Sequence, residues 1–182
     1  MSKIGKKNII LPKETSISIE GEKINIKGPK GTKILFINDK LFTSKVNEKN
    51  EFQILPIDKK NSDHKTSLLW GTYRSLINNA VIGVSNGHEK ILELNGVGFR
   101  ANLKGELLNL QIGFSHDVNF NIPKDVKISV EKQTTIKITG VDKELVSKIA
   151  ADIKNLKPVE PYKAKGITEK GQFILRKEGK KK

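Results

Sequence analysis

The chain has 182 residues, 34 basic and 20 acidic side chains, a formal net charge of +14 and no cysteine. The lack of cysteine excludes disulfides, zinc-thiolate sites and thiol nucleophiles, and it suits a reducing compartment better than secretion. No apolar run is long enough for a membrane span or a signal peptide, so we expect a soluble protein of one or two domains.

The positive charge is concentrated at the two ends. Residues 1–13 hold four lysines and no acid, and residues 157–182 hold nine cations and three acids, so these two segments supply +10 of the +14. Charge placed at unstructured ends is typical of a protein that binds a polyanion, either a nucleic acid or an anionic membrane. The alternative is a solvated, disordered tail that only maintains solubility.

A repeat occupies the interior of the sequence. In each copy a Leu/Ile-Pro-Lys triplet is followed by two short runs in which apolar and polar residues alternate, as strands with one buried face do. The second copy follows the first by 111 to 112 residues. The matching segments are Leu11–Lys13, 17–20 and 24–28 in the first copy, and Ile122–Lys124, 128–131 and 136–140 in the second. Each copy predicts a β-hairpin.

Two segments have helical periodicity. The first extends from about Thr66 to Ile82 and has an apolar face formed by Leu69, Tyr73, Leu76, Ile77, Ala80 and Val84. The second begins at Asp142, a predicted N-cap, and ends at Leu156 because Pro158 prevents its continuation.

Between the helices, residues 91–94, 99–103 and 107–112 alternate as antiparallel strands do, with Lys104-Gly105 as a tight turn. The sequence therefore predicts an α+β fold with an internal duplication: two similar domains, each a small, mostly antiparallel sheet with one helix. We expect the domains at 14–84 and 85–156, a basic N-terminal extension at 1–13 and a basic C-terminal tail at 157–182. Domains this small are marginal alone, so each should pack on the other or on a partner.

Two glycine motifs are better explained by turns than by ligand sites. Gly28-Pro29-Lys30-Gly31 matches the G-x-x-G loop of KH domains, but strand-like runs flank it where KH domains have helices. We expect a turn from which Lys30 can reach a phosphate. Gly96-Val97-Gly98 lacks the third glycine and the helix of a dinucleotide site, so a bulge or a close backbone approach is expected.

No pattern in the sequence predicts catalysis. His64, His88 and His116 are too far apart for a local metal motif, and no P-loop or nucleophile elbow is present. We expect no enzyme activity, no cofactor, no metal and no small-molecule substrate. Trp70 is expected to be a core anchor, and aromatic residues are only 5% of the chain, too few for a sheet of base-stacking rings.

The start of the tail combines a ring, two lysines and a glycine between residues 160 and 167. Pro158 and Pro161 favour an extended path, along which Tyr162 can stack on a base or sugar. Lys163 and Lys165 can then reach phosphates, and Gly166 allows a close backbone approach. A strap that packs on the preceding helix is an alternative compatible with this interpretation.

Taken in order, several segments resemble the bacterial-type ribosomal protein L6 family of the large subunit from end to end. The segments that carry the resemblance are Met1–Lys7, Lys27–Gly31, Leu69–Thr72 with Arg74, Asn78-Asn79, Leu94 with Gly96–Ala101, Gly113–His116, Glu160–Lys163 and Lys165–Ile167. Each segment is weak alone, and their order makes the match specific.

The resemblance implies a structural constituent of the large ribosomal subunit with the same duplicated fold. It implies binding and stabilisation of large-subunit rRNA near the sarcin-ricin loop and the base of the factor-binding stalk, in support of translation factors. Neighbouring ribosomal proteins at the stalk base are implied partners, and no membrane is. Combining family positions with charge, we expect rRNA contacts from Lys3, Lys6, Lys7, Arg100, Ser115, His116, Lys157, Tyr162, Lys163, Lys165, Gly166, Arg176 and Lys177.

Three positions depart from the family pattern. Asn8 and Asp117 stand where proline is usual, and Ala164 takes a typical glycine position. Asp117 places an anion where RNA approaches. Ala164 restricts the backbone between two lysines.

The host and the setting follow from composition. Lysine outnumbers arginine 31 to three, as in A+T-rich genomes. We expect a ribosome in the cytoplasm of such a bacterium or in the mitochondrial matrix, organelle-encoded because no presequence is seen, with a plastid less favoured. The alternative function is a free RNA-binding or chaperone module that acts outside a ribosome.

Overall fold

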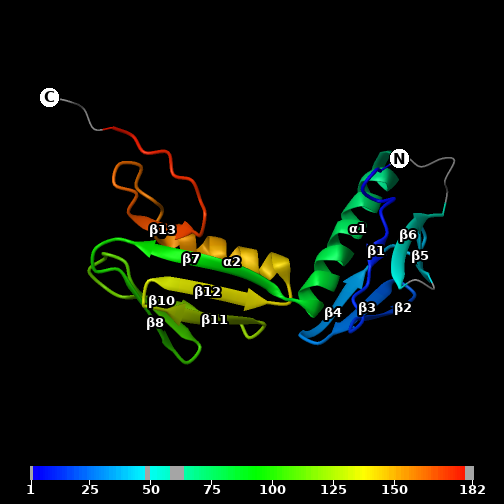
Figure 1. Cartoon of the computed structure of the whole chain (residues 1–182), viewed down its shortest axis with the longest axis horizontal. Coiled ribbons are helices and arrows are strands. Elements are labelled where there is room, and N and C mark those ends of the chain that lie inside the picture. The colour runs from blue at the N-terminus through cyan, green and yellow to red at the C-terminus, as the bar shows by residue number, and fades with distance from the viewer. Residues whose placement is uncertain (1, 48–49, 58–63, 179–182) are drawn as a thin grey trace. The chain divides into compact units, whose positions relative to one another are not determined.

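The computed structural model describes residues 2–47, 50–57 and 64–178, and residues 179–182 of the predicted tail lie outside them. The chain divides into two compact units, unit 1 at Met1–Gly87 and unit 2 at His88–Lys182. Within the described ranges each unit combines antiparallel sheets with one helix (Figure 1). The predicted α+β class with an internal duplication is confirmed, whereas the finer division into 1–13, 14–84, 85–156 and 157–182 stays a prediction.

Unit 1 has two three-stranded sheets, ordered β1-β6-β5 and β2-β3-β4. The helix α1 (His64–Ser85) packs on β3, β4 and β6. Trp70 is buried and its Nε1 donates to the Ile54 carbonyl at 2.8 Å, which confirms it as a core anchor. The strands are β1 (Ile9–Ile10), β2 (Ser16–Glu20), β3 (Lys23–Gly28), β4 (Gly31–Phe36), β5 (Phe42–Asn47) and β6 (Glu51–Pro56).

Unit 2 has a four-stranded sheet, β11-β12-β7-β13, and a three-stranded sheet, β10-β9-β8. The helix α2 (Lys143–Leu156) packs on β7, β12 and β13. The strands are β7 (His88–Asn95), β8 (Arg100–Lys104), β9 (Leu107–Gln111), β10 (Val118–Asn121), β11 (Val126–Glu131), β12 (Thr135–Gly140) and β13 (Gly166–Glu169). Lys104 pairs with Leu107, so the tight turn is Gly105-Glu106, one residue later than predicted.

Both hairpins of the sequence repeat are confirmed, as β2–β3 and β11–β12. The two copies also correspond in how strand packs on helix. The last residue of β3 and the last residue of β12 are both glycines, and each lies against the helix of its own unit. A Cβ added to Gly28 would lie 2.7 Å from the Val84 carbonyl oxygen, and one added to Gly140 would lie 2.8 Å from Cγ2 of Val146. A larger residue at either position would push helix and sheet apart.

The helices match their predicted positions with small differences at the ends. The helix α1 begins two residues before Thr66 and ends three residues after Ile82. Asp142 caps α2, and its side chain accepts a hydrogen bond from the Glu144 backbone N–H at 3.1 Å. Neither helix of the described ranges has the apolar length needed to cross a bilayer.

The G-x-x-G motif is the predicted turn, since Gly28 and Gly31 pair as the ends of β3 and β4. The suggested phosphate contact of Lys30 stays a prediction. Its backbone N–H donates to the Val84 carbonyl at 2.9 Å and its ammonium group donates to the Asn86 carbonyl. Lys30 thus satisfies carbonyls at the end of α1, where a cation also opposes the negative pole of the helix.

Candidate nucleic-acid interface

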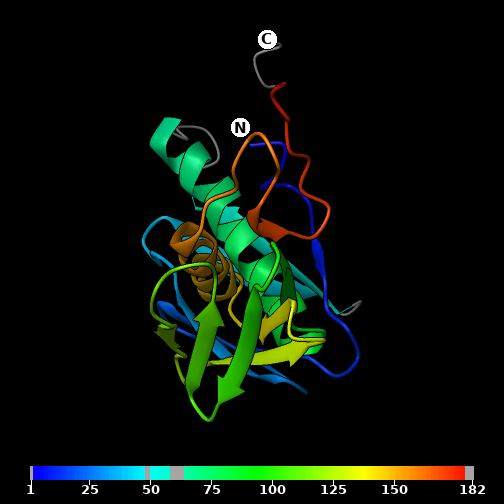
Figure 2. The ribbon, with the colours of Figure 1, turned by 90° about the vertical axis from the view of Figure 1, so that its left-hand side faces the viewer.

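Three loops gather where β7 terminates, which we call the loop end of unit 2. Asn95, the last residue of β7, pairs with Gly166, the first of β13. Arg100 at the start of β8 pairs with Gln111 at the end of β9. These pairings bring together residues 96–99, 112–117 and 157–165. Figure 2 faces this end, with the β8 and β9 region in green and the loop before β13 in orange.

The loop at 157–165 is closed, and the extended path predicted from its prolines is wrong. The Ala164 N–H donates to the Glu160 carbonyl at 3.0 Å, and the Glu160 N–H donates to the Lys165 carbonyl at 2.8 Å. Tyr162 and Lys163 therefore project from the tip of a turn. Closing it requires a left-handed residue, and Ala164 has a φ of 55°. This explains why glycine suits the position.

The cations of this loop meet those of the following tail at an open depression, which we call the basic depression. It has a volume of about 400 Å³ and is lined by Asn95, Gly96, Val97, Lys163, Ala164, Lys165, Ile174 and Arg176. The Lys177 N–H donates to the Pro161 carbonyl at 3.0 Å, which returns the tail to the loop. Three of the eight lining residues are cations and none is an acid. The lining is thus positively charged.

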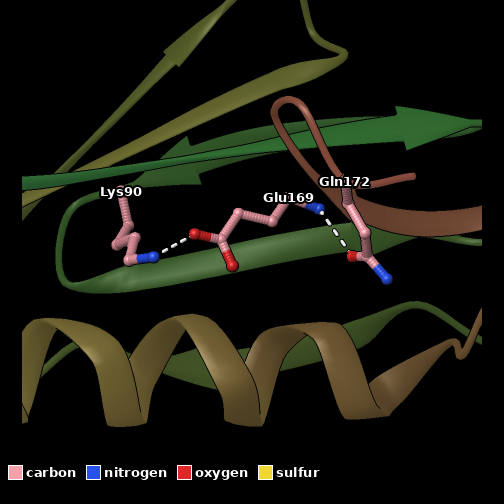
Figure 3. A network of polar contacts seen from close by, with 3 residues as sticks. All are labelled: Lys90, Glu169 and Gln172. Carbon is pink, nitrogen blue, oxygen red and sulfur yellow. Dashed lines mark hydrogen bonds and ion pairs between the residues drawn. The ribbon is translucent and has the colours of Figure 1, made fainter.

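The first part of the tail is an integral strand, so the prediction of an unstructured end is wrong for it. The strand β13 pairs antiparallel with β7, and Ile167 within it is fully buried. Lys90 of β7 forms an ion pair with Glu169, whose N–H donates to the Gln172 side chain at 3.3 Å (Figure 3). The compatible alternative, a strap that packs on the preceding helix, describes the observed contact of β13 with α2.

Gly166 differs from its predicted role as an RNA contact. It is buried, with a φ of +142° at which side chains are strained. A Cβ there would lie 2.7 Å from the Val159 Cα and 2.8 Å from the Pro158 carbonyl oxygen. The close approach that this glycine allows is to the chain's own backbone, and it sets the start of β13.

The loop at 112–117 contains an aromatic cluster that sequence reasoning did not identify. The rings of Phe114 and His116 are stacked, with centroids 6.2 Å apart and planes 17° apart. The Lys157 ammonium lies 4.4 Å from the centre of the Phe114 ring. Phe114 therefore brings together two predicted site residues, and we call these three residues the Phe114 cluster. In the sequence, Phe114 stood out only as a member of the family segment Gly113–His116.

Asp117 is held beside this cluster by amide groups. Its Oδ2 accepts from the Asn109 Nδ2 at 3.3 Å and from the Gln111 Nε2 at 3.4 Å, both on β9. The carboxylate is thereby tied to the sheet. Ser115 and His116, both exposed, form the outer part of the loop, and Arg100 is exposed at the start of β8.

The N-terminal lysines form a separate basic surface on unit 1. Lys3, Lys6 and Lys7 are exposed on a turn that docks on α1. Docking requires Gly5, since a Cβ there would lie 2.5 Å from Cδ2 of Trp70. The Arg74 Nε also donates to the Lys7 carbonyl at 3.3 Å. The structure thus brings together the predicted residues of unit 2, and these three lysines belong to unit 1.

Exposed cations beside main-chain loops and rings are typical of nucleic-acid-binding proteins. The family model described as Ribosomal protein L6 matches residues 11–87 and again residues 95–170. The chain belongs to the ribosomal protein L6 family, whose role is structural rather than catalytic, and the resemblance seen in the sequence is confirmed.

Individual relatives align over the whole of both chains. Proteins called large ribosomal subunit protein uL6 are 44% identical in Beijerinckia indica subsp. indica, 43% in Paracoccus denitrificans and 42% in Phenylobacterium zucineum. These relatives come from bacteria, so they support the bacterial alternative for the host and give no support to a mitochondrion or plastid.

Proposed function

We propose that this protein is a structural constituent of the large ribosomal subunit of a bacterium. It binds and stabilises large-subunit rRNA near the sarcin-ricin loop and the base of the factor-binding stalk, beside the ribosomal proteins there. In this position it supports the action of translation factors. Membership of the L6 family and the names of the relatives support the subunit, and the resemblance of the motifs supports the location.

The observation that carries the RNA-binding part is the basic depression. Lys163, Lys165 and Arg176 line it from two segments of the chain, and no acid lines it. Lysine neutralises phosphate as a point charge, whereas Arg176 offers a planar fork of donors for two phosphate oxygens. Contacts of this kind fix the register of RNA without reading its bases.

We assign RNA contacts to the predicted residues that the structure leaves accessible. Gly166 is excluded from them because it is buried. The contacts divide between the turn on unit 1 and the loop end of unit 2. They are Lys3, Lys6, Lys7, Arg100, Ser115, His116, Lys157, Tyr162, Lys163, Lys165, Arg176 and Lys177.

Sedimentation tests the assignment to the ribosome. A tagged chain expressed in a bacterium is expected to co-sediment with large subunits at physiological salt, one copy for each subunit. A photoreactive group at Tyr162, which is 54% exposed, is expected to cross-link to rRNA of the sarcin-ricin region. Recovery of the chain only in fractions free of ribosomes would favour the alternative of an independent RNA-binding module.

A further inference from the structure

The Phe114 cluster exposes two aromatic rings to solvent, although phenylalanine side chains are usually buried. The Phe114 side chain is 48% exposed and His116 is also exposed. Their stacking covers one face of each ring at most. Aromatic rings that stay in water next to cations are suited to stacking on a further flat group.

The backbone at the base of the cluster is held by the fold of unit 2. Lys157, 4.4 Å from the Phe114 ring centre, is anchored through its carbonyl, which accepts from the Ile167 N–H of β13 at 3.0 Å. The base of the loop is also fixed, because a Cβ on Gly113 would lie 3.2 Å from the Phe99 ring. A site ordered in advance loses little conformational entropy on binding.

The surroundings select the kind of flat group. Lys157 belongs to the same loop as Lys163 and Lys165, which line the basic depression. Asp117, the acid nearest in sequence, accepts hydrogen bonds from the β9 amides. Rings beside several lysines form the pattern with which proteins bind unpaired nucleotides, where bases stack and phosphates meet cations.

We propose that the Phe114 cluster is a stacking site for one unpaired nucleobase of RNA. The base lies against the imidazole of His116. Phe114, on which Lys157 packs, supports that imidazole, and the lysines of the loop meet the adjoining phosphates. This inference rests on the proposed function and extends it. It adds a second stacking contact to the loop end of unit 2, beside the one predicted for Tyr162.

The test compares variants in binding to a full-length large-subunit rRNA transcript. Phe114→Ala and His116→Ala are each expected to weaken binding roughly 10-fold, the effect of losing one stacked base. The dependence on salt should be unchanged, because no phosphate contact is lost. His116→Tyr keeps a ring and should bind within about 2-fold of the natural chain.

Phe36→Ala is the matched control. Phe36 is 66% exposed and has Lys23 5.9 Å from its ring centre, but among the described residues no second ring is stacked on it. We expect this variant to bind rRNA as the natural chain does. Circular dichroism checks that Phe36→Ala and the three variants of the Phe114 cluster all keep the fold of the natural chain.

A direct probe separates this inference from the proposed function. Short oligoadenylate should shift the His116 ring resonances in NMR spectra of the full chain, and an abasic oligonucleotide of equal length should not. Equal shifts with both probes, natural affinity in Phe114→Ala, or binding by His116→Tyr as weak as that of His116→Ala would each overturn the stacking site. Absence of the chain from ribosomes would instead refute the proposed function, and the NMR comparison would still decide the stacking.

Discussion

Gly166 is the residue on which the path of the tail depends. Replacing it by alanine adds a Cβ 2.7 Å from the Val159 Cα at a φ of +142°. Backbone strain and the clash with another stretch of backbone should together cost about 3 kcal/mol of unfolding free energy. Urea denaturation of Gly166→Ala against the natural chain measures this loss.

Gly105→Ala is the control for strain alone. Gly105 also has a positive φ, +62°, but a Cβ there would meet nothing within 4 Å. Its substitution should therefore cost only about 1 kcal/mol. Equal losses in the two variants would show that the contact with Pro158 and Val159 does not constrain the chain.

At the scale of elements, β13 makes the first part of the tail inseparable from unit 2. A chain that ends at Lys170 keeps β13 and should unfold as cooperatively as the full chain, while losing Arg176 and the phosphate contact that we propose for it. A chain that ends at Leu156 loses the pairing with β7 and the buried Ile167. This should cost about 5 kcal/mol, comparable to the whole stability of a small domain.

Thermal unfolding followed by circular dichroism distinguishes the two truncations. Removal of all 26 residues cannot serve as a test of RNA binding alone, because loss of binding would accompany loss of the fold. A cooperative transition in the chain that ends at Leu156, at the temperature of the full chain, would contradict a structural role for β13.

The elements that the sequence predicted are those with a repeating local pattern. The hairpins alternate over five or six residues, and Asp142 and Pro158 delimit α2. The strand β13 was missed because it has only four residues and its partner, β7, is distant in sequence. A short strand of this kind forms because a sheet offers it an edge to pair with, here β7. In the sequence, Pro158 and Pro161 suggested an extended tail instead.

The same distinction applies to the site. The exposed lysines were predictable, because charge in a segment with few apolar residues has to face water. The Phe114 cluster was not, because Phe114 and Lys157 belong to segments that only the folded sheet and helix bring together. Closure of the loop at 157–165 was equally hidden, since it depends on a left-handed backbone at an alanine.

At the scale of the whole molecule, +10 of the net charge of +14 lies in the two terminal segments, and the three cations of the basic depression belong to the second of them. If about six to ten phosphates are neutralised by both units, affinity for rRNA should fall by roughly 10³ to 10⁵ between 50 and 200 mM salt. Binding driven by net positive charge alone would also weaken as salt rises. To separate a local interface from net charge, variants that remove cations at different places on unit 2 have to be compared.

Two triple variants with the same change in net charge make that comparison. One replaces Lys163, Lys165 and Arg176 of the basic depression by glutamine. The control replaces three exposed lysines of unit 2 that are not among its lining residues, Lys104, Lys124 and Lys127. Both sets are exposed, so neither should disturb the core.

The most direct test is the salt dependence of rRNA binding by these two variants. We expect the depression variant to lower the slope of log affinity against log salt by about 2 to 3, one phosphate for each cation, and the control to leave it within about 0.5 of the natural slope. Equal reductions in the two variants would show that rRNA responds only to net charge, and would contradict an interface at the loop end of unit 2.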